Sequence, residues 1–512
     1  MDIRQVLDNV ADRFGDKPAV IFKGNEISFR QLRDNTLRLA SALKARGVNK
    51  SDKVAIYLPN CPEYIYSYLA CFCIGAVGVP LDYMLKADEL ISCISHSQAR
   101  LLIARPKTGV EFKDISVAAV GLEYMVLVGN SADTGQVVSL LYDNLMEEDC
   151  PCLDKIDISD HAPALIMYTS GTTGRPKGVL LNYRHLDGSP AAMEYFVDLS
   201  DKDVKLCALP LSHIGGFIYI QNCIKFGITL VLMERFHPFE FLEKVQQYKV
   251  TCFHIVPPMY NAILTLKQID RFDLSSLRWV VVFGAPSSPV IMKRFNRYCP
   301  NAKLLNGWGM TETCPPNTVT PFDSDNIASV GKPAPHCQIK IVDDEDNELS
   351  VGEIGEVIIG GWVVMDAYYK DPEATAAVLR DGWLHTGDLG RFDKDGFLYI
   401  VGRKKEMIKV GGQIVYAPEV EDALYKHEAV KEAAVIGIPD KMKGEAVKAF
   451  VVLKEWAVLE GDELRYFVRQ HLANFKVPQS IEIVDMLPKN RTGKIDKAIL
   501  KEREETKGIG VG

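Results

Sequence analysis

The sequence predicts an α/β fold in two parts: a large N-terminal domain of layered α/β subdomains with a β-rich subdomain, and a small, mobile α+β C-terminal domain. Short apolar runs alternate with helical segments up to about residue 305, which is typical of mostly parallel sheets covered by helices. From about residue 330, strands separated by acidic, glycine-containing turns indicate the β-rich subdomain. A charged, glycine-containing segment at 402–412 then suits a mobile joint. We therefore place the N-terminal domain at 1–404, with its β-rich subdomain at about 330–404, and the C-terminal domain at 405–512.

The first elements of the N-terminal domain begin with a capped helix. Ser28 can cap a helix that ends at Gly47, because apolar residues recur at helical spacing after it. A buried helix is expected at 62–76, where the apolar run ends at Pro80 and is too short for a membrane span. We expect strands at 54–58, 101–104, 206–209, 228–233, 251–256, 279–283 and 303–305, and helices at 238–248 and 289–297.

The later elements read as two smaller units. The β-rich subdomain is predicted to contain strands at 338–342, 356–359 and 397–401. Beyond the joint the chain restarts as a small α+β unit. We expect helices at 418–427 and 462–474 there, and strands at 433–438, 448–452 and 480–484.

Composition excludes several classes of protein. The 512 residues include 59 Lys and Arg against 67 Asp and Glu, and a net charge of −8 argues against a nucleic-acid-binding protein. The 12 cysteines show no paired zinc-ligand spacing, so free thiols in a reducing compartment are expected. The N-terminus is acidic and lacks the apolar segment of a signal peptide. We therefore expect a cytoplasmic protein without a transmembrane segment, either monomeric or homodimeric.

Residues 168–178, YTSGTTGRPKG, have the composition of a phosphate-binding loop. An apolar run leads into two glycines, four hydroxyl-bearing residues in the range 169–173, and then Lys177. Hydroxyls, backbone N–H groups freed by glycine and a lysine are the donors that cradle phosphate. The common P-loop needs glycine before its lysine, whereas Pro176 precedes Lys177 here. An ordinary surface turn is the alternative interpretation of this stretch alone.

Three further loops directly follow predicted strands. Residues 210–216 read PLSHIGG, residues 283–288 read FGAPSS, and residues 306–312 read NGWGMTE. Ligands of parallel α/β folds bind beyond the carboxyl ends of the strands, so these loops are expected to converge on one face. A lone His213 or Trp308 would otherwise be a core residue. Three polar segments come later, WLHTGD at 383–388, GRKKEMIKVGG at 402–412 and PKNRTGK at 488–494.

Taken in order, these motifs resemble the signature series of the adenylate-forming enzymes. That superfamily includes AMP-forming acyl-CoA synthetases, the adenylation domains of peptide synthetases and beetle luciferases. The resemblance covers nearly the whole chain. It is specific because five motifs occur in order, namely YTSGTTGRPKG, NGWGMTE, TGD at 386–388, GRKKEMIK and PKNRTGK. It implies an ATP-dependent acid–thiol ligase that uses Mg²⁺ and coenzyme A. The carboxylate attacks the α-phosphorus of ATP, pyrophosphate leaves, and the thiol of coenzyme A then expels AMP from the acyl-adenylate.

The resemblance also implies roles for individual residues. Glu312 matches the magnesium carboxylate, Thr311 the α-phosphate contact and Lys494 the lysine that bridges the substrate carboxylate and the α-phosphate. Trp308 would stack on adenine, and Asp388 and Arg403 would bind the ribose and α-phosphate side. The loop that holds the β- and γ-phosphates would comprise Thr169, Ser170, Gly171, Thr172, Thr173, Gly174 and Lys177. The remaining ATP or AMP contacts would be Gly284, Ala285, Pro286, Asn306, Gly307, Gly309 and Met310.

For the acyl group, the resemblance implies a pocket formed by His213, Phe283, Gly284 and Gly309. Glycine at 309 stands where acetate-specific relatives carry an indole, so the acid is expected to be larger than acetate or propionate. Phe283 replaces the first glycine of the usual G-G-A-P, which narrows or reshapes the pocket. Such an acid would be a medium- or long-chain fatty, alicyclic or aromatic acid.

The resemblance further implies a C-terminal domain that rotates between two poses. Lys405 matches the hinge. One pose would bring Lys494 into the site, and the other would bring Gly411 and Gly412 to the path of the coenzyme A thiol, where glycine lets pantetheine pass close to the backbone.

Two other interpretations stay open from sequence. A stand-alone adenylation enzyme could load an acyl or aryl acid onto a carrier protein, although no acidic residue for a substrate amine follows His213 closely. A catalytically silent nucleotide-binding protein is disfavoured because both Lys494 and Glu312 are present. The net direction of the reaction is not fixed by the sequence.

Overall fold

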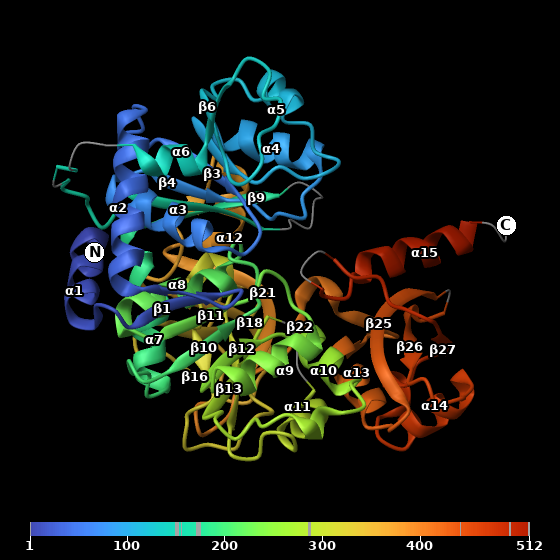
Figure 1. Cartoon of the computed structure of the whole chain (residues 1–512). Helices are drawn as coiled ribbons and strands as arrows, with labels where there is room; N and C mark the ends of the chain where they lie inside the picture. Colours follow the sequence, from blue (N-terminus) through green and yellow to red (C-terminus); the bar gives the residue numbers. More distant parts are fainter. Residues whose placement is uncertain are drawn as a thin grey trace.

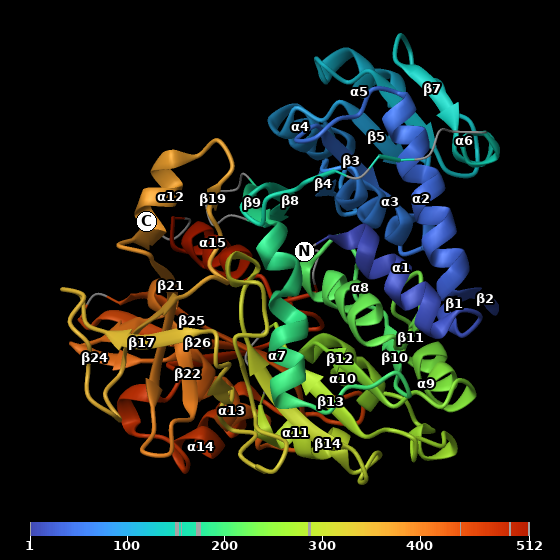
Figure 2. The same ribbon diagram turned by 90° about the vertical axis from the view of Figure 1, so that its left-hand side faces the viewer.

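The computed structural model describes residues 2–148, 153–154, 156–169, 176–284, 288–440, 442–490 and 493–509, with side chains up to residue 506. In these residues two large sheets form an N-terminal body, and a smaller sheet connects that body to a C-terminal unit with its own sheet (Figures 1 and 2). The α/β fold class expected from the sequence is confirmed, because helices cover two mostly parallel sheets in the N-terminal body and a smaller α+β unit follows it.

The first large sheet has the strand order β19-β9-β8-β4-β3-β5-β6-β7. Its strands from β8 to β7 are parallel, whereas β9 pairs antiparallel with β8 on one side and with β19 on the other. This pairing brings β19, from late in the chain, next to the hairpin of β8 and β9. The strands are β3 (Lys53–Tyr57), β4 (Val77–Pro80), β5 (Leu101–Ala104), β6 (Tyr124–Leu127), β7 (Val138–Leu141), β8 (Pro163–Thr169), β9 (Lys177–Asn182) and β19 (Ala367–Tyr368).

The second large sheet has the order β16-β15-β14-β13-β12-β10-β11-β1-β2. The strands from β14 to β1 are parallel, so their carboxyl ends point to one edge. That edge carries the loops singled out in the sequence. The strands are β1 (Pro18–Phe22), β2 (Asn25–Ser28), β10 (Val204–Cys207), β11 (Thr229–Leu232), β12 (Cys252–Ile255), β13 (Trp279–Val282), β14 (Lys303–Trp308), β15 (Thr318–Val319) and β16 (Lys332–Pro333).

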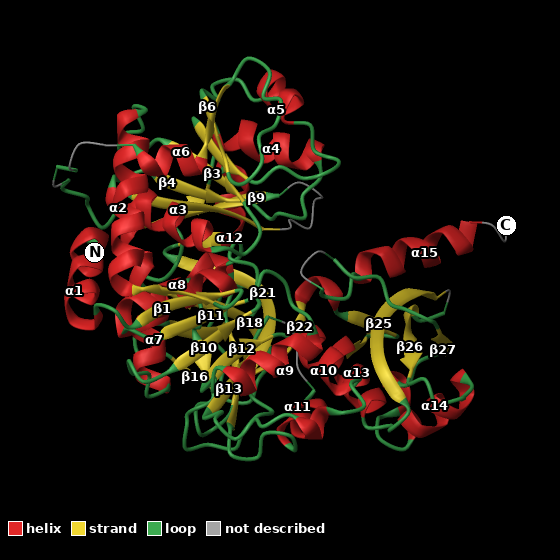
Figure 3. Ribbon diagram, in the orientation of Figure 1, coloured by secondary structure: helices red, strands yellow, loops and turns green. Residues whose placement is uncertain are grey.

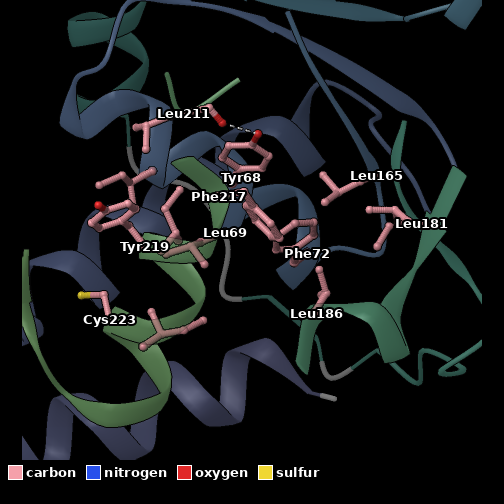
Figure 4. Packing of buried hydrophobic residues seen from close by; sticks show 14 of the residues in the cluster. Tyr68, Leu69, Phe72, Leu165, Leu181, Leu186, Leu211, Phe217, Tyr219 and Cys223 are labelled. Atoms are coloured by element: carbon pink, nitrogen blue, oxygen red, sulfur yellow. Dashed lines mark hydrogen bonds between the residues drawn. The ribbon is translucent and has the colours of Figure 1, made fainter. Parts of the chain in front are cut away.

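Helices between the two sheets form the main core. The ring of Phe72 meets that of Phe217 edge-on at 6.0 Å, and the hydroxyl of Tyr68 donates to the carbonyl of Leu211 over 2.8 Å (Figure 4). Burial of such large side chains is the dominant stabilising contribution in a core of this kind. The central helices are α1 (Ile3–Phe14), α2 (Phe29–Ala45), α3 (Pro62–Cys73), α7 (Gly188–Phe196) and α8 (Ile214–Phe226), with α6 (Tyr142–Glu147) beside α2 and the 3₁₀ turn η1 (Tyr183–Asp187) before α7.

Two further sets of helices cover the outer faces of the sheets, which gives the body its alternating helix and sheet layers. The first sheet is covered by α4 (Ala87–Ser97) and α5 (Phe112–Ala118). The second is covered by α9 (Pro238–Gln247), α10 (Pro257–Leu264) and α11 (Pro289–Asn296), with the 3₁₀ turn η2 (Ile269–Arg271).

The third sheet joins the body to the C-terminal unit. Its order is β17-β18-β21-β20, and β22 pairs with β21. After β22 the chain makes the 3₁₀ turn η4 (Lys404–Glu406) and enters the last sheet at β23. The elements are β17 (Gln338–Val342), β18 (Gly355–Gly360), α12 (Pro372–Val378), β20 (Leu379–Arg380), β21 (Trp383–Phe392) and β22 (Leu398–Arg403), and the 3₁₀ turn η3 (Thr311–Thr313) follows β14.

The C-terminal unit packs helices on both faces of a sheet ordered β24-β23-β26-β25, with β27 beside β26 (Figure 3). Helix α13 contacts α11 of the N-terminal body. The elements are β23 (Ile408–Val410), β24 (Gln413–Val415), α13 (Ala417–Tyr425), β25 (Val430–Asp440), β26 (Gly444–Leu453), α14 (Gly461–Arg469), the 3₁₀ turn η5 (Asn474–Lys476), β27 (Ser480–Ile483) and α15 (Lys497–Ile509).

Local sequence signals account for several of these boundaries. Ser28 caps α2 as predicted, because its hydroxyl accepts from the backbone of Gln31 while the Gln31 side chain accepts from the backbone of Ser28.

The cysteines in the described residues are free thiols, also as predicted. Among the same residues, no helix is both long enough and apolar enough to cross a membrane.

Candidate active site

The predicted phosphate loop is the turn of a β-hairpin. β8 ends at Thr169 and β9 begins at Lys177, and these two residues pair directly across the hairpin. Register therefore places the lysine at the base of the turn. Ser170, Gly171, Thr172, Thr173 and Gly174 lie outside the described residues, so their contact with phosphate stays a prediction.

Tyr368 connects Lys177 to Glu312. The Lys177 ammonium lies 4.9 Å from the centre of the Tyr368 ring, and the Tyr368 hydroxyl donates to Glu312 Oε1 over 2.9 Å. Burial and the neighbouring Glu312 raise the pKa of Tyr368, so its hydroxyl keeps its proton and remains a donor. Glu312 is 7 % exposed and follows Thr311 in η3, and its carbonyl accepts from the backbone of Met365.

This arrangement fits a Mg²⁺ ion that is bound mainly by water and by substrate phosphates. No group of three or more His, Cys, Asp or Glu side chains that could hold a metal occurs in the part of the chain that the structure describes. Mg²⁺ needs only one or two carboxylates when phosphates supply the other oxygens. The hydrogen bond from Tyr368 fixes the direction in which Glu312, the predicted Mg²⁺ carboxylate, points.

Trp308, Asp388 and Arg403 form a hydrogen-bonded group at the other end of the site. The Trp308 indole donates to Asp388 Oδ2 over 2.8 Å, and Arg403 Nε lies 2.6 Å from Asp388 Oδ1. Burial raises the pKa of Asp388, whereas Arg403, Trp308 and Lys494 oppose that rise. A carboxylate has about four acceptor positions, so Asp388 can still accept from ribose hydroxyls.

Lys494 reaches this group from the C-terminal unit. A Cβ placed at Gly284 would lie 3.9 Å from Lys494 Cε, and one at Gly493 would lie 3.6 Å from Pro258 at the start of α10. The residue as a whole is exposed, although its side chain reaches Gly284 of the N-terminal body. Burial and the Arg403 guanidinium lower the pKa of Lys494, while Asp388 raises it. The structure thus brings together residues from four separate motifs, at 283–288, 383–388, 402–412 and 488–494.

The loop after β13 lies beside Lys494. Gly284 has a φ of 86°, a conformation that favours glycine. Phe283 packs on Gly307 so closely that a Cβ there would lie 2.1 Å from its ring, and its ring meets His254 edge-on at 5.2 Å. Ala285 and Pro286, predicted to line the adenine slot, lie outside the described residues.

Two residues predicted to contact ATP or AMP, Asn306 and Gly309, have close partners within the protein. The Asn306 side-chain amide donates to the carbonyl of Ser329 over 3.0 Å, so it braces the end of β14. A Cβ at Gly309 would lie 2.5 Å from Pro315 and 2.7 Å from Asn317 Oδ1. The inference that glycine at 309 leaves room for the acid stays a prediction. Close packing accounts for the glycine, and its neighbour Met310 donates its backbone N–H to Thr313.

His213 precedes α8 and faces the other large sheet. Its Nε2 lies 3.3 Å from Asp82 Oδ2, which comes from the loop after β4. The side chain is 30 % exposed, so it lines an accessible part of the site edge and is not a core residue. Its predicted contact with the acyl group stays a prediction.

The residues predicted to form the hinge and the path of the thiol lie in the segment that follows Arg403. Lys405 is in η4, directly between β22 and the C-terminal sheet. Gly411 and Gly412 form the exposed turn between β23 and β24, with φ values of 58° and 83° and no neighbouring atom within 4 Å of a Cβ placed at either. In this structure Lys494, and not the glycine turn, lies beside the residues that are predicted to bind the nucleotide.

Comparison with known families identifies the protein. The pattern of the AMP-binding enzyme family matches residues 7–369, and that of the AMP-binding enzyme C-terminal domain matches residues 419–494. The chain belongs to the AMP-binding enzyme family. It is an AMP-forming acid–CoA ligase that uses ATP, Mg²⁺ and coenzyme A, so the resemblance drawn from the motifs is confirmed.

Its relatives span several acids. The ligase is 34% identical over 531 residues to a long-chain-fatty-acid–CoA ligase of Bacillus subtilis, with 98% of this chain and 94% of the relative covered. It is 35% identical over 489 residues to a feruloyl-CoA synthase of an Amycolatopsis species, covering 95% of each. The crystal structure of the anthranilate CoA ligase AuaEII with anthranoyl-AMP superimposes with a TM-score of 0.93 at 26% identity, over 99% of this chain and 98% of that one.

Tyr368 contacts two predicted site residues, Lys177 and Glu312, but was not itself singled out in the sequence. We expect Tyr368→Phe to raise the Mg²⁺ concentration needed for half-maximal activity by about tenfold, because Glu312 loses a hydrogen bond that orients it. Initial rates measured across a Mg²⁺ titration check this. Tyr369→Phe, at the neighbouring position, serves as control and should leave the titration unchanged. An unaltered Mg²⁺ requirement in Tyr368→Phe would contradict the role of Tyr368 in orienting Glu312.

Proposed function

We propose that this ligase activates a carboxylic acid larger than propionate at the site bounded by Lys177, Glu312, Asp388 and Lys494. The observation that carries the proposal is the meeting of Lys494, from the C-terminal unit, with Gly284 and Asp388 of the N-terminal body. Residues so far apart in sequence converge where an acyl-adenylate has its carboxylate, α-phosphate and ribose.

Electrostatics explain how these residues act in the first half-reaction. One oxygen of the acid's carboxylate attacks the α-phosphorus, and the bond to pyrophosphate breaks as negative charge spreads over the phosphate oxygens. Lys494 binds both the attacking carboxylate and the α-phosphate, while Lys177 neutralises the departing pyrophosphate. When bound, Mg²⁺ at Glu312 neutralises further phosphate charge. Asp388 and Arg403 hold the ribose so that the reacting atoms stay aligned.

The second half-reaction requires a different position of the C-terminal unit. The thiol sulfur attacks the acyl carbon, AMP leaves with the bonding electrons, and the thiol proton passes to solvent. We place the N-terminal domain at 1–404 and the rotating domain at 405–512, with Lys405 as hinge. The observed position, with Lys494 at the site and Gly411 and Gly412 exposed, supports an assignment to the adenylate-forming pose.

The acid is proposed to be a medium- or long-chain fatty, alicyclic or aromatic acid. Support comes from relatives whose names specify a long-chain fatty acid, feruloyl and indoleacetate. The cytoplasmic location and the monomeric or homodimeric state predicted from sequence stay predictions.

Thioester formation tests this proposal against the carrier-protein alternative. A panel of acids is incubated with ATP and Mg²⁺, and either coenzyme A or a holo-carrier protein. We expect an acyl-CoA with at least one acid of the panel and release of AMP and pyrophosphate that depends on the acid. Acylation of the carrier protein without acyl-CoA formation would support the alternative.

A further inference from the structure

A row of buried polar side chains lies behind Phe283, on the face of the second sheet that α8 covers. Lys205 comes from β10, His254 from β12, Trp279 from β13 and Asn222 from α8. Lys205, Trp279 and Asn222 are 0% exposed and His254 is 1% exposed. Lys205 pairs in register with Cys252, two residues before His254, so the row extends along adjacent strands.

These side chains lack hydrogen-bond partners within the described residues. The unpaired atoms are the ammonium of Lys205, both ring nitrogens of His254, the indole nitrogen of Trp279 and both amide atoms of Asn222. Buried polar groups in folded proteins are almost always paired, and an unpaired buried ammonium is among the most costly exceptions. Several such exceptions in one place indicate that the row pairs with a bound group.

The charge of Lys205 indicates the chemistry of that group. Asp203, the carboxylate whose charge acts on Lys205, is already bound to Arg278 at 2.7 Å and to the Thr251 hydroxyl at 2.7 Å. The ammonium instead lies over the rings of Tyr219 and Trp279, 4.9 and 5.4 Å from their centres. Those rings stabilise a cation but accept no conventional hydrogen bond from it. An anionic oxygen acceptor would satisfy both the charge and the donors.

The row is continuous with the proposed acyl site. The centre of the His254 ring lies 5.2 Å from that of Phe283 and 5.2 Å from that of Tyr219. Tyr219 belongs to α8, the helix that begins just after His213. In the sheet His254 lies opposite Val281, three residues before Gly284. At roughly 3.3 Å per residue, that places the start of the row about 10 Å below the point where Lys494 reaches the site.

We propose that Lys205, with His254, binds a second carboxylate at the distal end of the substrate, so that the ligase acts on a dicarboxylic acid. The inference rests on the proposed function, because it assumes that the acyl chain extends from Gly284 past Phe283. The reacting carboxylate stays at Lys494, and the distal carboxylate takes no part in bond making.

Matched acids test this inference. Straight-chain monocarboxylic and dicarboxylic acids of increasing, equal length are compared by kcat/KM for pyrophosphate release and for acyl-CoA formation. We expect the wild type to prefer the dicarboxylic acid at one chain length. Lys205→Met, which keeps the length of the side chain and removes the charge, should lower kcat/KM for that acid on the order of 100-fold and leave the matched monocarboxylic acid within a few-fold. Lys202→Met, at an exposed lysine close in sequence, is the control.

Thermal unfolding provides a second readout that needs no turnover. The preferred dicarboxylic acid should raise the melting temperature of the wild type and not that of Lys205→Met. Without ligand, Lys205→Met should melt higher than the wild type because it removes a buried, unpaired charge, which also shows that the variant folds.

Two outcomes would overturn the inference. One is a wild type that prefers the monocarboxylic acid at every length. The other is a Lys205→Met variant that loses activity equally with both acids, as expected if the row holds only ordered water. In either case acyl-CoA formation with monocarboxylic acids would leave the proposed function standing, whereas no acyl-CoA from any acid would refute the proposed function itself.

Discussion

Replacing Lys494 with alanine is expected to lower the rate of acyl-adenylate formation on the order of 100- to 1000-fold. The Lys494 side chain lies next to Gly284, and the charges of Asp388 and Arg403 act on its ammonium. A cation placed in such a site stabilises charge that develops on the attacking carboxylate and the α-phosphate far more than it would in water. The loss should appear in single-turnover formation of adenylate from acid and ATP.

Measuring the second half-reaction distinguishes loss of this role from a general loss of structure in the variant. Lys494→Ala should convert preformed acyl-adenylate and coenzyme A to thioester at close to the wild-type rate. Lys489→Ala removes a lysine of the same segment that pairs with Glu432 at 2.6 Å, and it should leave both half-reactions intact. An equal loss of both half-reactions in Lys494→Ala would contradict the assignment of Lys494 to adenylate formation.

Lys405→Pro is expected to have the opposite pattern. Lys405 lies in η4, between the last strand of the third sheet and the first strand of the C-terminal sheet. Proline fixes φ near −65° and restricts the residue before it, so a rotation about this position would be blocked. Adenylate formation should persist, because the observed structure already places Lys494 in the site. Thioester formation should fall on the order of 100-fold, since the reacting groups no longer align.

The same variant distinguishes a hinge from a binding residue. Lys405→Ala removes the side chain but keeps the backbone free, so it should retain most thioester formation. Both steps are measured separately, with acid and ATP for the first and with preformed acyl-adenylate and coenzyme A for the second. If Lys405→Ala and Lys405→Pro lose thioester formation equally, the side chain matters and the backbone rotation at Lys405 does not.

Local patterns in the sequence predicted much of the fold. The strands predicted at 101–104 and 338–342 have the observed bounds of β5 and β17, and Ser28 marked the start of α2. Some observed boundaries differ from the predicted ones, for example where pairing with a neighbouring strand extends a strand. β14 was expected to end at 305 but continues to Trp308, because Gly307 and Trp308 pair antiparallel with β15. Helix α14 ends at Arg469, before the 3₁₀ turn η5, although its predicted pattern extended to 474.

Contacts between distant segments could not be predicted in the same way. Tyr368 joins the site only because β19 pairs with β9, which aligns Tyr368 with Val179 at the phosphate hairpin. The partner of His213, Asp82, comes from the other sheet. The close approach of Pro315 and Asn317 to Gly309 likewise depends on tertiary packing, which the local sequence does not show. Lys205 and His254 lie in apolar runs, and nothing local marks them as unpaired.

The fate of the carboxylate oxygen tests the central claim most directly. An acid that the enzyme accepts is labelled in its carboxylate with a heavy oxygen isotope and incubated with ATP, Mg²⁺ and coenzyme A, and the products are analysed by mass spectrometry. Attack on the α-phosphorus predicts one labelled oxygen in AMP and none in pyrophosphate, with AMP formed in equal amount to acyl-CoA. Label in pyrophosphate or inorganic phosphate, or the appearance of ADP, would contradict the account.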